Sequence, residues 1–129
     1  MIFDRIQKGQ LDWDLIDQVW NDVAIVISNP ELEDCPIVFA NDKFLEHSGY
    51  TEKEVLGRNC RFMQGAETEQ EAINLFRRII AEQRTETVVV TNYKKDGTKF
   101  RNKVLLTAVK DREGKNTLIV AVQQKLVIH

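Results

Sequence analysis

The chain has 129 residues, 43% of them hydrophobic and 29% charged, which is typical of one globular domain with room for one small enclosed ligand. Its 18 basic and 20 acidic residues form no long block, so we expect neither nucleic acid nor a membrane surface as a partner. No apolar run approaches the length of a membrane span and the N-terminus lacks the layout of a signal peptide, so we expect a cytoplasmic protein.

The first third of the chain predicts a helix, two strands and a second, short helix. Residues 11–20 place apolar side chains at helical spacing, with Asp12 as the expected N-cap. Segments 23–28 and 36–40 are apolar and β-branched around a loop of turn-forming residues, which predicts two paired strands. Asn41 is expected to cap the second helix.

The middle third predicts helices that flank a short, glycine-bounded segment. Two capping boxes mark helix starts, Thr51-x-x-Glu54 and Thr68-x-x-Glu71. The second box is expected to open the longest helix, over residues 69–83, which carries one apolar stripe. Between the boxes lies GRNCRFMQG (57–65), which is too short for a long helix and therefore places Cys60 on a single helical turn.

The last third predicts three consecutive antiparallel strands joined by tight turns at Asp96-Gly97 and Glu113-Gly114. The complete order of elements indicates an α+β fold, a five-stranded antiparallel sheet with helices on one face and an N-terminal flanking helix. We expect two parts, a flanking segment over residues 1–22 and a core domain over residues 23–127.

The last three strands carry amides among apolar residues on one face. Alternation places Asn92, Asn102 and Gln123 there, and a buried amide without a partner costs about 1–3 kcal/mol. We therefore expect these amides to bond one another or to face a polar group inside the domain. The opposite face is also apolar and needs a cover, which we expect from the leading helix, a second copy of the chain, or both.

GRNCRFMQG resembles the flavin-binding signature of the light-oxygen-voltage (LOV) family, usually written GxNCRFLQG, with Met63 in place of leucine. Further blocks resemble the family in the same order, PIVFANDKF and GY upstream, NYKKDGTKFRN and VAVQ downstream. The resemblance covers about residues 23–125, and the chain is similar to bacterial short LOV proteins. LOV domains are flavin-binding photoreceptor domains of the PAS superfamily. The resemblance therefore implies a PAS-like fold and a blue-light photoreceptor that is not an enzyme.

By this resemblance, Cys60 is the thiol that forms a reversible covalent adduct with the flavin after photon absorption, and Gln123 is the amide that responds when the neighbouring ring nitrogen is protonated. The other implied flavin contacts are Asn59 and Gln64 at the ribityl chain or ring edge, Arg61 and Arg77 at the terminal phosphate, and Asn92 and Asn102 at the pyrimidine edge. Guanidinium groups suit phosphate because they form bidentate, charge-assisted hydrogen bonds. The implied cofactor is FMN, with FAD less favoured, and no metal is implied.

Light is expected to act by rearranging the sheet and a homodimer formed through the outer sheet face and the N-terminal helix. Arg101, which stands where the family often has tryptophan, falls on that outer face because it alternates with Asn102. Ala121 stands where glycine is usual and shares the face of Gln123, so its methyl group is expected to crowd the flavin ring.

Two other functions remain open from the sequence. One is a PAS-type ligand-sensing or protein-interaction module without photochemistry. The other is a thiol enzyme, which would need a base beside Cys60, and His47 is the sole internal histidine. Cys35 and His47 are otherwise interpreted as structural or incidental residues.

Overall fold

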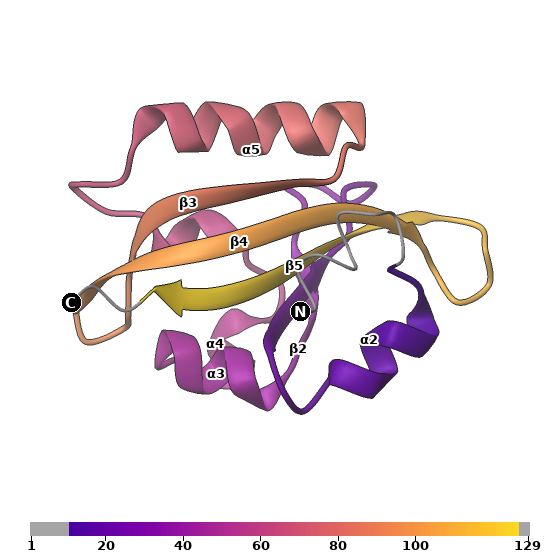
Figure 1. Ribbon diagram of the computed structural model, residues 1–129, viewed down its shortest axis with the longest axis horizontal. Helices are drawn as coiled ribbons and strands as arrows, with labels where there is room; N and C mark the ends of the chain where they lie inside the picture. The colour runs from indigo at the N-terminus through magenta and orange to yellow at the C-terminus, as the bar shows by residue number, and fades with distance from the viewer. Residues whose placement is uncertain (1–10, 127–129) are drawn as a thin grey trace.

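The computed structural model describes residues 11–126, which form a five-stranded antiparallel sheet with helices packed against it (Figure 1). The strand order is β2-β1-β5-β4-β3, so the last strand of the chain lies at the centre of the sheet. The strands are β1 (Ala24–Ser28), β2 (Ile37–Ala40), β3 (Glu86–Tyr93), β4 (Lys99–Lys110) and β5 (Thr117–Leu126). This arrangement confirms the α+β fold predicted from the sequence.

The helices between β2 and β3 cover one face of the sheet, the inner face. They are α3 (Asp42–Ser48), α4 (Glu52–Val55), the 3₁₀ turn η1 (Cys60–Met63) and α5 (Gln70–Glu82). Helix α5 runs alongside β3 and β4 (Figure 1). Buried side chains of these helices, such as Phe44, Val55 and Ile79, join one cluster with Val90 and Phe100 of the sheet. Within residues 11–126, no helix has both the length and the apolarity to cross a bilayer.

Helix α2 (Trp13–Val19) covers the outer face of the sheet. The Asp12 carboxylate caps this helix by accepting a hydrogen bond from the Leu15 amide at 2.9 Å. Leu15 and Ile16 are buried and belong to one cluster with Leu105 and Val120 of the outer face. Burial of one such aliphatic side chain contributes about 1.5–3 kcal/mol. The expectation that the leading helix packs on this face is therefore confirmed.

Polar contacts also fasten α2 to the turn between β4 and β5. The indole Nε1 of Trp13 donates a hydrogen bond to the Lys110 carbonyl at 2.9 Å. The Arg112 guanidinium lies 4.3 Å from the centre of the Trp13 ring and pairs with the Asp17 carboxylate at 2.8 Å. These contacts set the position of α2 along the outer face.

Local capping starts α3 and α4 where the sequence predicted. The Asn41 Oδ1 accepts a hydrogen bond from the Phe44 amide at 2.9 Å and so caps α3. At the start of α4, Thr51 and Glu54 bond each other's backbone amides reciprocally. Both caps satisfy donors that the first turn of a helix leaves free.

The prediction that Thr68 and Glu71 form a second capping box is wrong. Helix α5 begins after Glu69, which makes no side-chain cap hydrogen bond. The Thr68 Oγ1 instead accepts from the Gly65 amide at 2.9 Å and donates to the Thr91 carbonyl at 2.7 Å. The hydroxyl therefore fastens the loop before the helix to strand β3, and it is not available to the helix.

Candidate functional site

A cavity of about 210 Å³ lies between the inner face of the sheet and the helical layer. Its apolar lining consists of Ile73, Phe76, Ile80, Val104, Leu106, Ile119 and Ala121. All of the residues that the resemblance assigns to the flavin also line it: Asn59, Cys60, Arg61, Gln64, Arg77, Asn92, Asn102 and Gln123. The fold thus gathers these side chains from η1, α5 and three strands around one enclosure.

Cys60 opens the 3₁₀ turn η1, as predicted, and its thiol is free. The turn begins here because the Asn59 Oδ1 accepts a hydrogen bond from the Arg61 amide at 2.9 Å. The Ser28 Oγ lies 3.9 Å from the Cys60 sulfur. Cys60 keeps accessible surface, yet the surrounding protein desolvates a thiolate and raises the pKa of Cys60 to about 11, against a smaller lowering effect of Ser28. The thiol is therefore protonated at neutral pH.

A protonated thiol does not suit a cysteine-dependent enzyme, because the thiolate is the nucleophile in such chemistry. The base candidate His47 places its Nε2 3.0 Å from the Asn102 Oδ1. In the described part of the chain, no hydrogen bond joins His47 to Cys60. The geometry therefore gives no support to a thiol enzyme.

The three buried amides bond one another across neighbouring strands. The Asn102 Nδ2 donates to the Asn92 Oδ1 at 2.9 Å and to the Gln123 Oε1 at 2.8 Å. The Asn92 Nδ2 donates to the backbone carbonyls of Met63 and Thr91, both at 3.3 Å. The amides thus form the linked polar group that the sequence predicted, and they line the cavity.

His47 joins this polar group, although no sequence pattern placed it beside the amides. Its Nε2 contacts the Asn102 Oδ1 at 3.0 Å, and its ring packs edge-on against Phe100 with centroids 5.0 Å apart. Burial lowers the pKa of His47, the Asn102 hydrogen bond opposes that effect, and Lys125 and Lys94 add to the lowering. A single histidine on a short helix carries no sequence signal for a partner 55 positions away on another strand.

The two arginines expected at a phosphate have different surroundings. Arg61 forms a bidentate ion pair with Asp34 at 2.6 and 2.5 Å, which lowers the pKa of Asp34 and raises that of Arg61. The Asn59 Nδ2 also binds the Asp34 carbonyl, at 2.7 Å. Arg77 lines the cavity from α5, and no ion pair engages it among residues 11–126. A phosphate at this cavity would therefore meet Arg77 directly and compete with Asp34 for Arg61.

Comparison with known proteins identifies the family. The PAS domain family model matches residues 22–124. Over 98 residues the chain is 46% identical to phototropin-2 of Oryza sativa subsp. japonica, a match that covers 76% of this chain and 11% of that protein. Over 92 residues it is 44% identical to blue-light-activated histidine kinase 1 of Erythrobacter litoralis, covering 71% of this chain and 26% of that protein. A structure solved in work on a flavin analogue and the light-oxygen-voltage domain mechanism superposes with a TM-score of 0.82 at 40% identity, covering 90% of this chain and 87% of that one.

The chain is a LOV domain of the PAS family. The resemblance that GRNCRFMQG and its flanking blocks carry is thereby confirmed. This LOV domain spans about a tenth of phototropin-2 and about a quarter of the histidine kinase, since the matches cover 11% and 26% of those proteins.

The loop before β2 brings a second cysteine to the cavity of this LOV domain. Asp34 and Cys35 have φ angles of 64° and 46°, in the left-handed region, and the Arg61 and Asn59 contacts of Asp34 hold the loop there. Cys35 lines the cavity, and burial, followed by the Asp34 charge, raises its pKa. Cys35 is therefore part of the cavity wall, which the turn sequence around it did not indicate.

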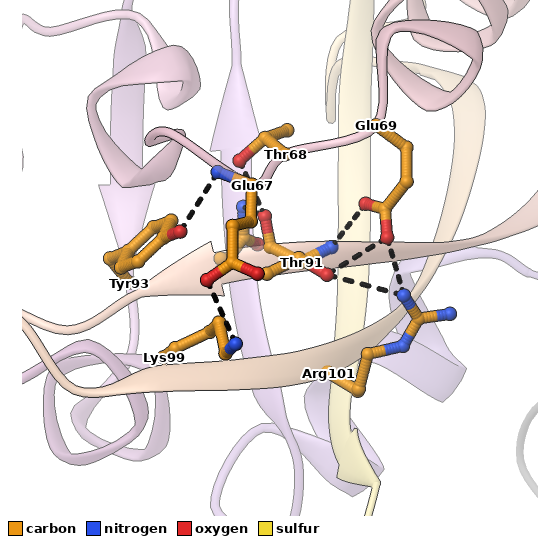
Figure 2. Close-up of polar contacts among 8 residues, drawn as sticks. Glu67, Thr68, Glu69, Thr91, Tyr93, Lys99 and Arg101 are labelled. Carbon is orange, nitrogen blue, oxygen red and sulfur yellow. Dashed lines mark hydrogen bonds and ion pairs between the residues drawn. The ribbon is translucent and has the colours of Figure 1, made fainter.

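Residues 65–69 form a strap over the edge strand β3, beginning at the last glycine of the LOV signature (Figure 2). A Cβ atom added to Gly65 would lie 2.3 Å from the Tyr93 Cε1, so this close approach requires glycine. The Tyr93 Oη accepts a hydrogen bond from the Glu67 amide at 2.9 Å, and Thr68 binds the strand as described above. The strap thus fixes the end of the turn that carries Cys60 against β3.

The side chain of Glu69 reaches across the sheet edge to Thr91 and Arg101. Its carboxylate accepts from the Thr91 amide at 2.8 Å, from the Thr91 hydroxyl at 2.9 Å and from Arg101 at 2.5 Å (Figure 2). The Thr91 amide is the largest of several contacts that lower the pKa of Glu69 to about 2. Arg101 alternates in step with Leu105 of the outer-face cluster, so it lies on the outer face, as predicted, and it pairs with a carboxylate of its own chain.

Proposed function

We propose that this LOV domain binds FMN in the cavity and senses blue light through a reversible cysteinyl-flavin adduct at Cys60. The observation that supports this function best is that one cavity holds a protonated thiol, three linked amides and two arginines. A cavity of about 210 Å³ favours FMN over FAD, because the second nucleotide of FAD would need a further enclosure.

The side chains present suit the chemistry of each part of FMN. Within residues 11–126 the amino group of Gln123 has no hydrogen-bond partner, so it is free to meet an acceptor in the cavity. Asn92 and Asn102 can exchange their mutual bonds for the carbonyl and ring nitrogens of the pyrimidine edge. Arg77, together with Arg61 once it leaves Asp34, would hold the phosphate through charge-assisted hydrogen bonds.

The protein groups around the thiol suit light sensing. When bound, the flavin supplies a ring that absorbs blue light and then accepts the thiol sulfur. Because the pKa of Cys60 is raised, the thiol brings its own proton to this reaction. In the adduct, the ring nitrogen next to Gln123 would carry that proton and would donate a hydrogen bond instead of accepting one. Gln123 then has to present its oxygen to this nitrogen, where before it presented its amino group. Since Gln123 lies on the central strand β5, whose outer face contacts α2, this rotation can bias the packing of α2.

We also propose that the outer face and α2 form a homodimer interface through which the signal leaves the domain. Val89, on the outer side of the edge strand β3, is 37% exposed. A second copy of the chain would cover this apolar edge. Sedimentation at high protein concentration is expected to show a dimer, and a strict monomer in darkness and in light would contradict this interface.

We propose that the domain senses light and does not catalyse a reaction, and that it lies in the cytoplasm. The histidine kinase relative matches this chain over only 26% of its length, so its kinase activity is not carried over. Free thiols at Cys35 and Cys60 suit a reducing compartment.

Absorption spectra of FMN-loaded protein test the proposed function. The flavin bands are expected to bleach under blue light and to return in darkness in the parent, and to stay unbleached in Cys60→Ala. The matched control Cys35→Ala removes the other cavity cysteine and should still bleach. Protein that binds no flavin would favour the PAS-type ligand-sensing alternative, and unchanged bleaching in Cys60→Ala would assign the reaction to another residue.

A further inference from the structure

His47, Asn102, Asn92 and Gln123 form one hydrogen-bonded chain between two cavities. A second cavity, of about 450 Å³, lies beside the first and is lined by His47. Gln123 lines both cavities, whereas Asn92 and Asn102 line only the first. The chain is therefore a polar wall between the proposed flavin site and the second cavity.

The hydrogen bonds of this chain run in one direction. The two backbone carbonyls at its far end only accept, so Asn92 presents its amino group to them and its oxygen to Asn102. Asn102 then donates through Nδ2 to both Asn92 and Gln123, which leaves only its oxygen for His47. An oxygen needs a donor, so the His47 Nε2 carries a proton.

Reversal of this direction depends on the state of His47. In the FMN-loaded protein, the flavin edge replaces the bond between Asn92 and Asn102, so Asn92 no longer fixes the direction of the Asn102 amide. If Gln123 then turns its amino group toward Asn102, Asn102 must answer with its oxygen and turn its own amino group toward His47. A neutral imidazole with its proton on Nδ1 accepts that hydrogen bond at Nε2, whereas a protonated imidazole has a donor on both nitrogens. Two donors would then face each other, which is disfavoured at this partly buried contact.

The surroundings of His47 keep it neutral at pH 7. The charged groups that line the second cavity with it are Lys43 and Glu46 on its own helix, Asp22 before β1, Lys94 after β3 and Lys125 on β5. Burial is the largest cause that lowers the pKa of His47, and Lys125 and Lys94 add to it against the hydrogen bond to Asn102. Reversal of the chain is therefore available at neutral pH and is lost as acid protonates the ring.

We propose that His47 is a positioning residue that sets the direction of the amide chain, and thereby decides whether Gln123 presents its amino group or its oxygen to the flavin cavity. This proposal rests on the proposed function, in which light requires Gln123 to present its oxygen. A protonated His47 and the reversed chain disfavour each other. By linkage, each lowers the equilibrium constant for formation of the other by the same factor. Light therefore lowers the pKa of His47, by about one unit for a tenfold coupling.

Nitrogen NMR of the imidazole reports these proton positions directly. The only other histidine is His129, so the His129→Gln variant leaves a single imidazole to observe. In flavin-free protein we expect the neutral ring to carry its proton on Nε2 and to titrate below 6.5. In FMN-loaded protein we expect illumination to lower that pKa by about one unit. A proton on Nδ1 in the flavin-free protein overturns the proposal whether or not flavin binds, and equal pKa values in darkness and light also overturn it.

The rate of dark recovery gives a pH profile that a purely structural role would not produce. Because acid disfavours the reversed chain, the parent is expected to recover faster toward acid, with an inflection at the pKa of His47, below pH 6.5. His47→Gln keeps a donor and an acceptor but does not titrate, so its profile should be flat. Lys43→Gln removes a neighbouring charge of the same cavity and should keep the inflection. An inflection that survives in His47→Gln overturns the proposal.

Failure of the flavin to bleach is a separate outcome, because it contradicts the proposed function. The tautomer of His47 in flavin-free protein then decides the proposal on its own, with a proton on Nε2 supporting the direction of the chain and a proton on Nδ1 overturning it.

Discussion

Asn102 is the centre of the polar wall, and its replacement by alanine should destabilise the domain even without flavin. The side chain is 1% exposed and makes three hydrogen bonds, at 2.8 Å to Gln123, 2.9 Å to Asn92 and 3.0 Å to His47. Asn102→Ala removes all three at once and leaves two amide oxygens and one imidazole N–H without their partner. The loss is therefore larger than that of one ordinary surface hydrogen bond.

The expected magnitude follows from the number and burial of these bonds. A net contribution of about 0.5–1.5 kcal/mol for each hydrogen bond gives a decrease of about 2–4 kcal/mol in the free energy of unfolding. Water that enters from the cavity can satisfy part of the orphaned groups, which favours the lower half of this range. For a domain of this size the decrease corresponds to a lower Tm by roughly 8–16 °C.

Urea unfolding of the flavin-free protein measures this effect. The matched control is Asn74→Ala, because Asn74 lies exposed on α5 and accepts one hydrogen bond from Gln70 at 3.0 Å. The control should change stability by less than about 0.5 kcal/mol, or raise it slightly, since alanine favours a helix. Equal stability losses in Asn102→Ala and Asn74→Ala would refute the idea that the amide chain stabilises the fold.

Three further substitutions test the strap and the phosphate end of the cavity. Gly65→Ala should cost about 1–3 kcal/mol in urea unfolding, because its Cβ meets the Tyr93 ring; Tyr93→Ala in the same chain should remove most of that penalty, and a penalty that persists would contradict the clash. Glu69→Gln should lower stability by less than about 1 kcal/mol, because the ion pair is partly exposed. Folding lowers the pKa of Glu69 from 4.5 to about 2, so the stability difference between the parent and Glu69→Gln should be complete above pH 4.5 and should fade as pH falls toward 2. A stability difference that does not change with pH would count against this account. Asp34→Asn frees Arg61 from its ion pair, so FMN should bind about fivefold tighter, whereas riboflavin, which lacks the phosphate, should bind as before. Fluorescence titrations measure both affinities, and an equal gain for both flavins would exclude phosphate binding by Arg61.

Local patterns in the sequence predicted most of the fold. The caps at Asp12, Asn41 and Thr51 act within the first turn of their own helices, so the residues that decide them are adjacent in the chain. The prediction failed at Thr68, because its hydroxyl binds the carbonyl of Thr91, 23 positions away. Only the packing of the strap against β3 makes that partner available.

The same distinction applies to the site. Strand alternation alone predicted that the amides share a buried face, and the structure joins them as neighbours there. The contact of His47 with Asn102 and that of Arg61 with Asp34 span 55 and 27 positions, and neither has a sequence pattern that could announce it. Their roles depend on which charges and amides the folded chain brings together.

Infrared spectroscopy of the Cys60 S–H bond tests the central claim most directly. The chain has two cysteines, so the Cys35→Ser variant leaves Cys60 as the only source of an S–H band. In the FMN-loaded variant, this band should be present in darkness, disappear under blue light as the flavin absorption bleaches, and return with it in darkness. An S–H band that persists unchanged while the flavin absorption bleaches would contradict the formation of a bond between the sulfur and the flavin.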